Sequence, residues 1–413
     1  MEGLQPLYRR VAGIDVHRML HVVTVVIEKP DGSIEQSSRE FGGFKRDCRA
    51  LSVWLVELGV ELVVMESTGI YWKSLYSHIE RAGIEAWVVN AHFVKHVPGR
   101  KTDMSDSQWL AVLARFGLVR GSFIPPQDLR ELRMVSRYRR KLNTMRASEI
   151  NRLHKILDDG GIKLGGVVSD INGVSAREMV AGLIQGLAIE HLPGMARGRL
   201  KLKREDLQAA LDGDLSKRHL FVLKHLHAHI GVLEQDIAEL DAYILGAMAP
   251  YQWAHRLLQT MPGIDQIASA LILIEIGDDM TRFGGADRLA AWAALCPGNN
   301  ESAGKRKSGR TRKGNAIIRT ILCECANAAR MTKSSLAAKY KSLMVRKTHK
   351  KTIVAIAHKM IRLIYLLLTR KQAYRDPMAD YEAMSAKKNA PRWIRQLKLI
   401  GQWPDKATAP AVG

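Results

Sequence analysis

Alternating apolar and polar positions in the first ninety residues predict short strands and helices in a regular order. β-Branched and aliphatic residues dominate three early segments, and Asp31-Gly32 is a turn signal between the second and the third. Longer apolar periods then alternate with short apolar runs. We expect strands at 11–16, 20–28, 34–41, 61–66 and 84–89, and helices near 43–58, near 70–82 and from about Thr102. The first three strands should form an antiparallel meander.

Three strands followed by helix, strand, helix, strand and helix is the order of a ribonuclease-H-like α/β domain. Pro125-Pro126 ends this region, and a charged helical pattern runs from 127 to 157. A second long helix is predicted where Leu and Ile recur in heptads from Leu223 to Ile244. We interpret this helix as a coiled-coil arm, which pairs either within the chain or between subunits.

The composition changes again after Pro250. Pro262-Gly263-Ile264 lies between two apolar helical stretches, as in a helix-hairpin-helix, whose backbone amides bind phosphate. An ordinary connection between helices fits this string equally well. We therefore expect a ribonuclease-H-like domain at 1–125, a helical and coiled-coil region at 126–250, a mostly α domain at 251–380, and a basic tail at 381–413 whose pattern indicates disorder.

The positive charge of the chain is concentrated near its C-terminal end. The formal net charge is +22, and residues 301–413, with 26 basic and 6 acidic residues, contribute +20 of it. So many cations interspersed with apolar residues repel one another unless a polyanion neutralises them. The distribution favours a nucleic-acid partner, although a solvated cationic face would have the same composition.

Other sequence features exclude several classes of protein. The four cysteines form no CxxC pair, which argues against a zinc ribbon and fits a reducing cytoplasm. The N-terminal residues lack the apolar core of a signal peptide. The apolar stretch from Ile353 to Leu368 contains His358, Lys359 and Arg362, so we expect a buried amphipathic helix and no membrane partner.

Four carboxylates form the main candidate site. Asp15 lies in GIDVH, Glu66 in VVMESTGIYW, and Asp103 and Asp106 in KTDMSDSQWLA. The pattern puts Asp15 inside the first strand, Glu66 at the end of the fourth, and the last two acids at i and i+3 of one helix, on one face. An ionised Asp in a core strand is costly without a cation partner. Singly, each acid could be a turn residue or a helix N-terminal acid, but together they predict a Mg²⁺ (or Mn²⁺) site for phosphoryl transfer.

Basic residues adjoin this site and a second candidate site. Arg100 and Lys101 precede the last two acids and either contact phosphate near the metal or only offset the acidic charge. The string CPGNNESAGKRKSGRTRKGN, at 296–315, is a glycine-punctuated loop that offers hydroxyls at Ser302 and Ser308. From chemistry alone, such a serine is usually a turn or phosphate contact. Six cations of the loop are candidate backbone contacts: Lys305, Arg306, Lys307, Arg310, Arg312 and Lys313.

These strings, in this order and spacing, resemble the DEDD transposases of bacterial insertion sequences over residues 10–370. The resemblance implies that Asp15, Glu66, Asp103 and Asp106 are the metal-binding quartet. It also implies that Ser302, which follows Pro297 after four residues, is the catalytic serine. Many members have glycine directly after this serine, which Ser308-Gly309 matches and Ser302-Ala303 does not, so Ser308 stays an alternative.

The resemblance further implies how such an enzyme works. Strands are cleaved through a covalent 5′-phosphoserine link, assisted by metal from the RuvC-like domain at a composite site. A structured RNA encoded by the element pairs with donor and target DNA. No RRM or KH signature is present, and delegating sequence choice to RNA fits a protein rich in backbone-directed cations.

We therefore expect a DNA transposase or recombinase in the bacterial cytoplasm that acts as a homo-oligomer, a dimer or a tetramer. Two other functions fit the residues. One is a RuvC-like nuclease or junction resolvase that uses metal-activated water and no serine. The other is a non-catalytic scaffold that binds DNA or RNA.

Overall fold

A computed structural model describes residues 5–67, 69–90, 94, 105–298, 300–302, 305–308, 310–311, 313–379 and 381–402 of the 413-residue chain, with the backbone alone for 300–302, 305–308, 382 and 385. The chain divides into two compact units, Met1–Gln127 and Asp128–Gly413. The division lies two residues from the expected end of the first domain. Residues 128–413 cluster as one unit, where the sequence pattern predicts two domains and a tail.

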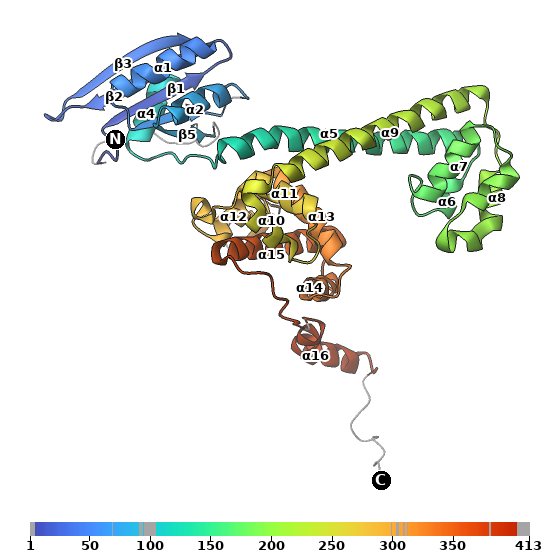
Figure 1. The fold of residues 1–413 in the computed structure, drawn as a ribbon. Helices are drawn as coiled ribbons and strands as arrows, with labels where there is room; N and C mark the ends of the chain where they lie inside the picture. The colour runs from blue at the N-terminus through green and yellow to red at the C-terminus, as the bar shows by residue number, and fades with distance from the viewer. Residues whose placement is uncertain are drawn as a thin grey trace. The chain divides into compact units, whose positions relative to one another are not determined.

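The first unit is built on one five-stranded mixed sheet (Figure 1). Its strands are β1 (Arg10–Val16), β2 (Leu20–Glu28), β3 (Ile34–Gly42), β4 (Leu62–Glu66) and β5 (Glu85–Val89). They are ordered β3-β2-β1-β4-β5, with antiparallel pairs β1–β2 and β2–β3 and parallel pairs β1–β4 and β4–β5. The antiparallel meander that the sequence predicts for the first three strands is confirmed.

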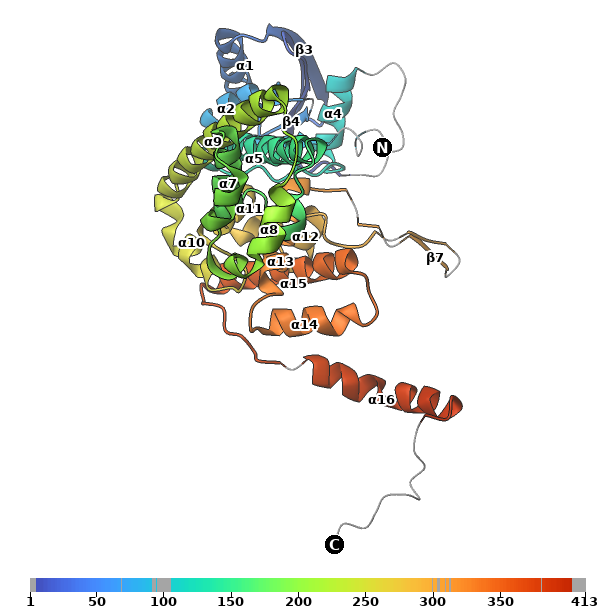
Figure 2. The same cartoon turned by 90° about the vertical axis from the view of Figure 1, so that its right-hand side faces the viewer.

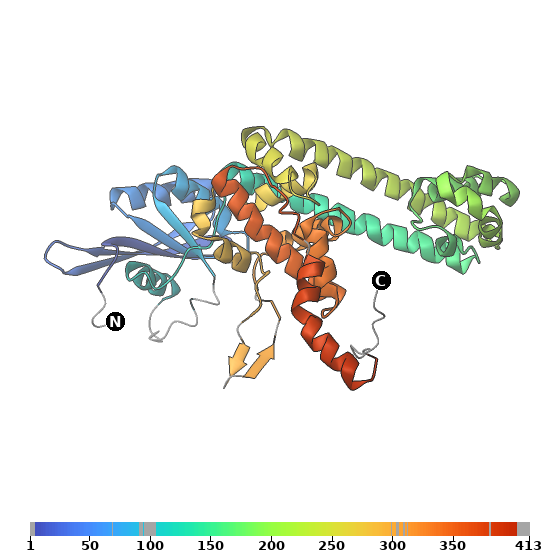
Figure 3. The same cartoon turned by 90° about the horizontal axis from the view of Figure 1, so that it is seen from below.

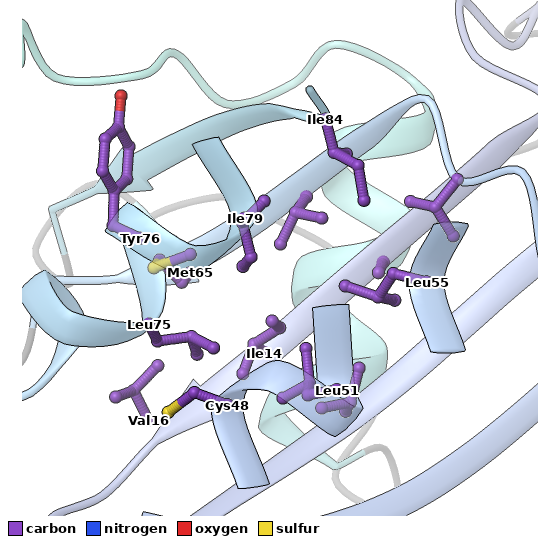
Figure 4. Packing of buried hydrophobic residues seen from close by; sticks show 14 of the residues in the cluster. Ile14, Val16, Cys48, Leu51, Leu55, Met65, Leu75, Tyr76, Ile79 and Ile84 are labelled. Atoms are coloured by element: carbon purple, nitrogen blue, oxygen red, sulfur yellow. The ribbon is translucent and has the colours of Figure 1, made fainter. Parts of the chain in front are cut away.

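Helices cover both faces of this sheet. α1 (Lys45–Glu57) and α2 (Trp72–Arg81) pack on one face, and α4 (Asp106–Arg115) packs on the other. Figure 4 shows side chains from β1, β4, α1 and α2 meeting in the first of these two cores, with Ile14 and Met65 fully buried. Because both faces are covered, β1 and β4 are almost continuously apolar. A polar side chain in either strand therefore stands out.

Two long helices dominate the second unit, α5 (Gln127–Asp159) and α9 (Lys217–Gly246). They run antiparallel, because Asp241 near the end of α9 pairs with Arg139 near the start of α5, while His219 pairs with Asp159 at 3.0 Å. Apolar residues of the predicted heptads pack against α5, with Leu233 against Leu142. The arm is thus paired within the chain (Figure 1).

Short helices connect the two long ones and complete the unit. Between α5 and α9 lie α6 (Leu164–Val167), α7 (Val174–Ile184), η1 (Ile189–Met195), η2 (Gly198–Lys203) and α8 (Arg204–Leu211). After α9 come η3 (Ala249–Tyr251), α10 (Gln252–Gln259), α11 (Gln266–Ile276), η4 (Met280–Phe283), α12 (Ala286–Trp292), β6 (Asn300–Ser302), β7 (Lys305–Ser308), α13 (Ala316–Ala329), α14 (Ser335–Met344), α15 (His349–Arg370) and α16 (Tyr381–Leu399). Figure 2 shows α13, α14 and α15 as neighbouring helices.

α15 is the one helix of the described residues that is long and apolar enough to cross a membrane. Half of its apolar window is buried inside the fold, where it packs on α12 and α13. A core helix passes the same test of length and composition, and the buried residues of α15 fit that description.

The disorder expected for residues 381–413 does not extend over Tyr381–Leu399, which forms α16. Contacts with the preceding helices account for the difference. The Tyr381 ring lies between the ammonium groups of Lys339, at 4.6 Å, and Lys359, at 4.5 Å, and its hydroxyl accepts a hydrogen bond from Lys359 at 2.7 Å. Composition alone does not reveal these contacts.

Candidate functional site

The parallel pairing of β1 and β4 brings two of the four predicted acids to neighbouring positions. Ile14 lies opposite Met65 in the ladder, so Asp15 and Glu66 are the next residues along the two strands. Such neighbours lie about 4.8 Å apart and face the same side of a sheet. The shared face is the one that α4 covers, because Val64, two residues before Glu66, packs in the α4 core. Asp15 is 27% exposed.

Gly13, two residues before Asp15 in β1, lets α4 approach the sheet closely. A Cβ at Gly13 would lie 2.0 Å from the backbone oxygen of Ser107 and 2.4 Å from the nitrogen of Ala111. Ser107 also shares a 2.8 Å hydroxyl hydrogen bond with Thr24 of β2. The other end of α4 is tied to the residues before β1, since the Arg115 carbonyl accepts the Leu7 amide at 2.8 Å. The N-terminal turn of α4, which begins with exposed Asp106, therefore lies toward the Asp15 end of β1.

One predicted feature of the quartet is corrected. The helix expected from about Thr102 begins at Asp106, because Ser105 is extended and its hydroxyl accepts the Gln108 amide as an N-cap. The helical face that Asp103 and Asp106 were expected to share is therefore not a face of α4, which starts at Asp106. Asp103, Arg100 and Lys101 lie outside the described residues. The sequence carried a signal for this start, since Ser105 and Gln108 have the spacing of a capping box.

A histidine that the sequence reasoning did not single out contacts the first acid. Nε2 of His17 lies 3.0 Å from Oδ2 of Asp15, and the imidazole side chain is 58% exposed. The signal was its place two residues after Asp15, because residues at i and i+2 in extended chain point the same way. The contact places the imidazole beside the Asp15 carboxylate, near the C-terminal end of β1.

Within the part of the chain that the structure describes, no group of three acidic, histidine or cysteine residues is arranged to hold a metal ion. The donor chemistry nevertheless fits a hard cation, since Asp15 and Glu66 offer carboxylate oxygens side by side. The four cysteines are all free, and burial raises the pKa of the Cys325 thiol to about 12, which keeps it protonated. A thiolate metal site is not favoured at that residue.

The predicted serine loop is a β-hairpin in the second unit. β6 and β7 pair antiparallel, as the two arrows in Figure 3 show. Ser302 lies opposite Lys305 in this pairing. At the base of the hairpin, Pro297 forms a β-bridge with Thr311, and the Gly298 amide donates to the Arg310 carbonyl at 2.7 Å. The hairpin therefore presents Ser302 close to its turn.

The structure describes the six basic residues of the loop in different detail. Lys305, Arg306 and Lys307 form β7 together with the alternative nucleophile Ser308, and their backbone alone is described. Exposed Arg310 and Lys313 follow on the return arm. Arg312 lies outside the described residues. Most of β7 is thus basic and lies beside the strand that carries Ser302.

The Pro262-Gly263 string connects α10 to α11 and packs against α13. Gly263 has φ +86°, and a Cβ there would lie 2.4 Å from the Cys325 carbonyl. Asp265 caps α11 by accepting the Ala268 amide at 2.7 Å. This helix N-terminus thus already carries a carboxylate of its own. These contacts are those of a close connection between helices.

The two units define a class of protein. A mixed sheet in the order β3-β2-β1-β4-β5, with carboxylates at the ends of its parallel strands, is consistent with a RuvC-like, ribonuclease-H-like domain. A mostly helical and strongly basic region follows it. Together these features describe an enzyme that acts on nucleic acid.

Comparisons with known proteins give the family. A model of the DEDD transposases of IS110 matches residues 12–161, and a model of the IS116/IS110/IS902 transposase family matches residues 255–341. Together they span more than half of the chain. This chain belongs to that family of insertion-sequence transposases, which cleave and rejoin DNA.

Curated relatives support the assignment over most of the chain's length. The transposase for insertion sequence element IS1111A of Coxiella burnetii is 25% identical over 335 residues, covering 78% of this chain and 81% of the relative. The transposase for IS1328 of Yersinia enterocolitica is 23% identical, covering 75% and 84%. A probable family 20 transposase of Pseudomonas aeruginosa is 24% identical, covering 76% and 86%.

Proposed function

We propose that this transposase cleaves and rejoins DNA through a covalent phosphoserine intermediate formed at Ser302, with assistance from Mg²⁺ (or Mn²⁺). The observation that carries the proposal is the register of β1 and β4, which puts Asp15 and Glu66 side by side at the ends of two buried parallel strands. Two carboxylates at neighbouring positions on one face of a sheet offer the oxygen ligands that a hard divalent cation prefers.

The metal ligands in this proposal are Asp15, Glu66, Asp103 and Asp106. When bound, the cation supplies charge stabilisation to the oxygens of the scissile phosphate. The protein contributes the placement of the carboxylates, through the β1–β4 register and through the close packing of α4 on Gly13. His17 orients the Asp15 carboxylate through its 3.0 Å contact.

The serine step is a transesterification. Attack by the Ser302 hydroxyl oxygen forms a bond to phosphorus and breaks the bond between phosphorus and the 3′-oxygen, which leaves with a proton as a 3′-hydroxyl while the serine hydroxyl loses its own. A 5′-phosphate then remains on the serine. Another 3′-hydroxyl can attack this phosphoester, which releases the serine and rejoins the strand without an external energy source.

The basic residues would hold the backbone of the substrate. Lys305, Arg306 and Lys307 of β7 lie on the strand paired with Ser302, so phosphates near the scissile bond would meet them first. Arg310, Arg312, Lys313, Arg100 and Lys101 complete the proposed contacts. We further propose that an RNA encoded by the element selects donor and target DNA, and that the enzyme acts as a dimer or tetramer in the bacterial cytoplasm.

The decisive experiment compares two serines of one hairpin. Purified wild-type, Ser302→Ala and Ser308→Ala proteins are incubated with Mg²⁺ and labelled DNA carrying the boundaries of the insertion element, in the presence of RNA transcribed from its flanks. We expect a denaturant-stable, protease-sensitive DNA adduct with wild type and Ser308→Ala but none with Ser302→Ala. An adduct that persists in Ser302→Ala and disappears in Ser308→Ala would reject the assignment of Ser302.

Two further outcomes identify the other functions. Cleavage without any adduct, in all three proteins, would identify a nuclease that uses activated water. For the metal site, Asp15→Asn and Glu66→Gln should abolish cleavage while the affinity for DNA stays unchanged. If the wild type cleaves no DNA and both variants bind nucleic acid as the wild type does, the chain is a non-catalytic scaffold.

A further inference from the structure

A buried carboxylate holds the base of the serine hairpin. Glu275, in the last turn of α11, is 1% exposed. Its Oε2 accepts a hydrogen bond of 2.7 Å from Nδ2 of Asn315, the residue that joins the hairpin to α13. The side-chain oxygen of Asn315 in turn accepts the amides of Ile317 and Ile318, at 2.9 and 3.3 Å, as the N-cap of α13. One asparagine therefore links α11 to the first turn of α13.

Two arginines of α5 offset the charge of Glu275. Nε of Arg133 lies 3.4 Å from Oε2, and Nη2 of Arg137 lies 3.7 Å from Oε1. Arg133 also donates to the backbone oxygens of Ile274 and Glu275, the latter at 2.6 Å. Oε2 of this buried carboxylate is held by both Asn315 and Arg133, and removing the charge of Arg133 leaves Glu275 with the more distant Arg137 alone. Glu275 is therefore a fixed point to which Asn315 is attached.

The other end of the hairpin segment is fixed at the same place. The Asn315 amide donates to the Trp292 carbonyl at 2.9 Å, and a Cβ on Gly314 would lie 2.5 Å from that oxygen. Ala294, just after α12, has φ +56°, a left-handed conformation that is unfavourable for alanine. Tertiary contacts must maintain it. The segment that follows the hairpin, at Gly314 and Asn315, therefore packs closely against the turn that precedes the hairpin.

We propose that Glu275, acting through Asn315, is a positioning residue that sets the position of the serine hairpin and hence of Ser302. This inference rests on the proposed function of Ser302. Neither residue touches the reacting atoms. A shift at the base of a two-stranded hairpin is carried to its turn, where a displacement of about 1 Å can cost about 10²-fold in rate.

The chain allows a reversal of this hydrogen bond. In Asn315→Asp the capping oxygen is kept, but a second carboxylate faces Glu275 across a contact made at 2.7 Å in the wild type. In the double variant Glu275→Gln/Asn315→Asp, the new amide donates to the new carboxylate, and the total charge of the group equals that of the wild type. Asn327→Asp is a matched control on the same helix, since its amide donates to the Cys323 carbonyl and not to Glu275.

The first measurement is the single-turnover rate of adduct formation at saturating DNA, together with the dissociation constant for DNA. For Asn315→Asp we expect a loss of about 10²-fold in rate and a dissociation constant within about twofold of the wild type. The double variant should recover most of the rate, and Asn327→Asp should match the wild type. A general loss of folding would lower the melting temperature and the affinity as well, and reversing the bond would not restore the rate.

The second measurement does not depend on activity. Trypsin cleavage after Arg310 and Lys313 is followed by mass spectrometry in the full-length protein. We expect faster cleavage in Asn315→Asp by about tenfold, and wild-type cleavage in the double variant and in Asn327→Asp. Cleavage and adduct rates like those of the wild type in Asn315→Asp, or no recovery in a double variant that melts like the wild type, would overturn the proposal. If the wild type forms no adduct, the proposed role of Ser302 is wrong. The trypsin comparison then still tests whether Glu275 and Asn315 hold the base of the hairpin.

Discussion

Gly13→Ala tests whether the packing of α4 on β1 builds the carboxylate site. The added Cβ would lie 2.0 Å from the Ser107 backbone oxygen, whereas ordinary contacts begin at 3.4 Å. The difference, about 1.4 Å, is the distance by which α4 has to retreat. Because both close atoms are backbone atoms, no rotamer change relieves the clash. The helix that begins with Asp106 must therefore move away from Asp15.

The magnitude follows from two contributions. Overpacking a buried site costs about 1–3 kcal/mol. Retreat of α4 also breaks the buried hydrogen bond between Ser107 and Thr24, which contributes about 0.5–1.5 kcal/mol. We expect the first unit to lose about 2–4 kcal/mol of stability, which raises the exchange rate of its most protected amides by about 10²-fold.

Hydrogen exchange followed by mass spectrometry reads this loss segment by segment in the full chain. Gly231→Ala is the control, because no atom lies within 4 Å of a Cβ at this exposed position of α9, and alanine should stabilise the helix by about 1 kcal/mol. Metal-dependent cleavage should fall in Gly13→Ala and stay unchanged in Gly231→Ala. Wild-type exchange in β1 and α4 of Gly13→Ala would refute the close packing and the reasoning built on it.

Three more predictions concern the second unit. Gly314→Ala should destabilise the contact between α12 and the base of the hairpin by about 1–3 kcal/mol, seen as faster exchange in α12 and α13, because its Cβ would lie 2.5 Å from the Trp292 carbonyl. Arg133→Met should cost about 3–5 kcal/mol in denaturant unfolding, since it removes a partner of buried Glu275; an unchanged midpoint would contradict the ion pair. The pKa of Asp376 is lowered, because hydrogen bonds from Ser335 and Met378 outweigh the opposing effect of burial, which is the largest single influence. Asp376 therefore stabilises the folded protein fully above its unfolded pKa of about 4, and this stabilisation is lost as the pH falls through the lower folded pKa. Asp376→Asn should make the melting temperature decline less steeply on acidification. An equal decline in both proteins would contradict this prediction.

The predicted order of elements in the first unit is correct because each element is specified by residues close together in the sequence. Strands with two covered faces are continuous apolar runs, and Asp31-Gly32 terminates one of them whatever the rest of the chain does. The start of α4 was misplaced by four residues although its signal is also local. Acidic residues near Thr102 suit a helix N-terminus, but the Ser105 hydroxyl caps the helix at Asp106.

Other features depend on contacts between residues far apart in the sequence. The heptads of α9 specify an apolar stripe, and either a second subunit or α5 could cover it; the pairing of Arg139 with Asp241 occurs within the chain. Glu275 sits in an apolar helix, and its sequence gives no sign that Asn315, forty residues later, will bind it. The same holds for Tyr381 between two lysines.

The sequence by itself determined the strands, the long helices, the positions of the acids within them, and the accumulation of positive charge near the C-terminal end. Only the tertiary structure decided which acids become neighbours. The register of β1 and β4 brings Asp15 beside Glu66, and the missing side chain of Gly13 lets α4 close over that face. The physical reason is that periodicity fixes the face on which a side chain lies, while register and close packing fix what lies opposite it.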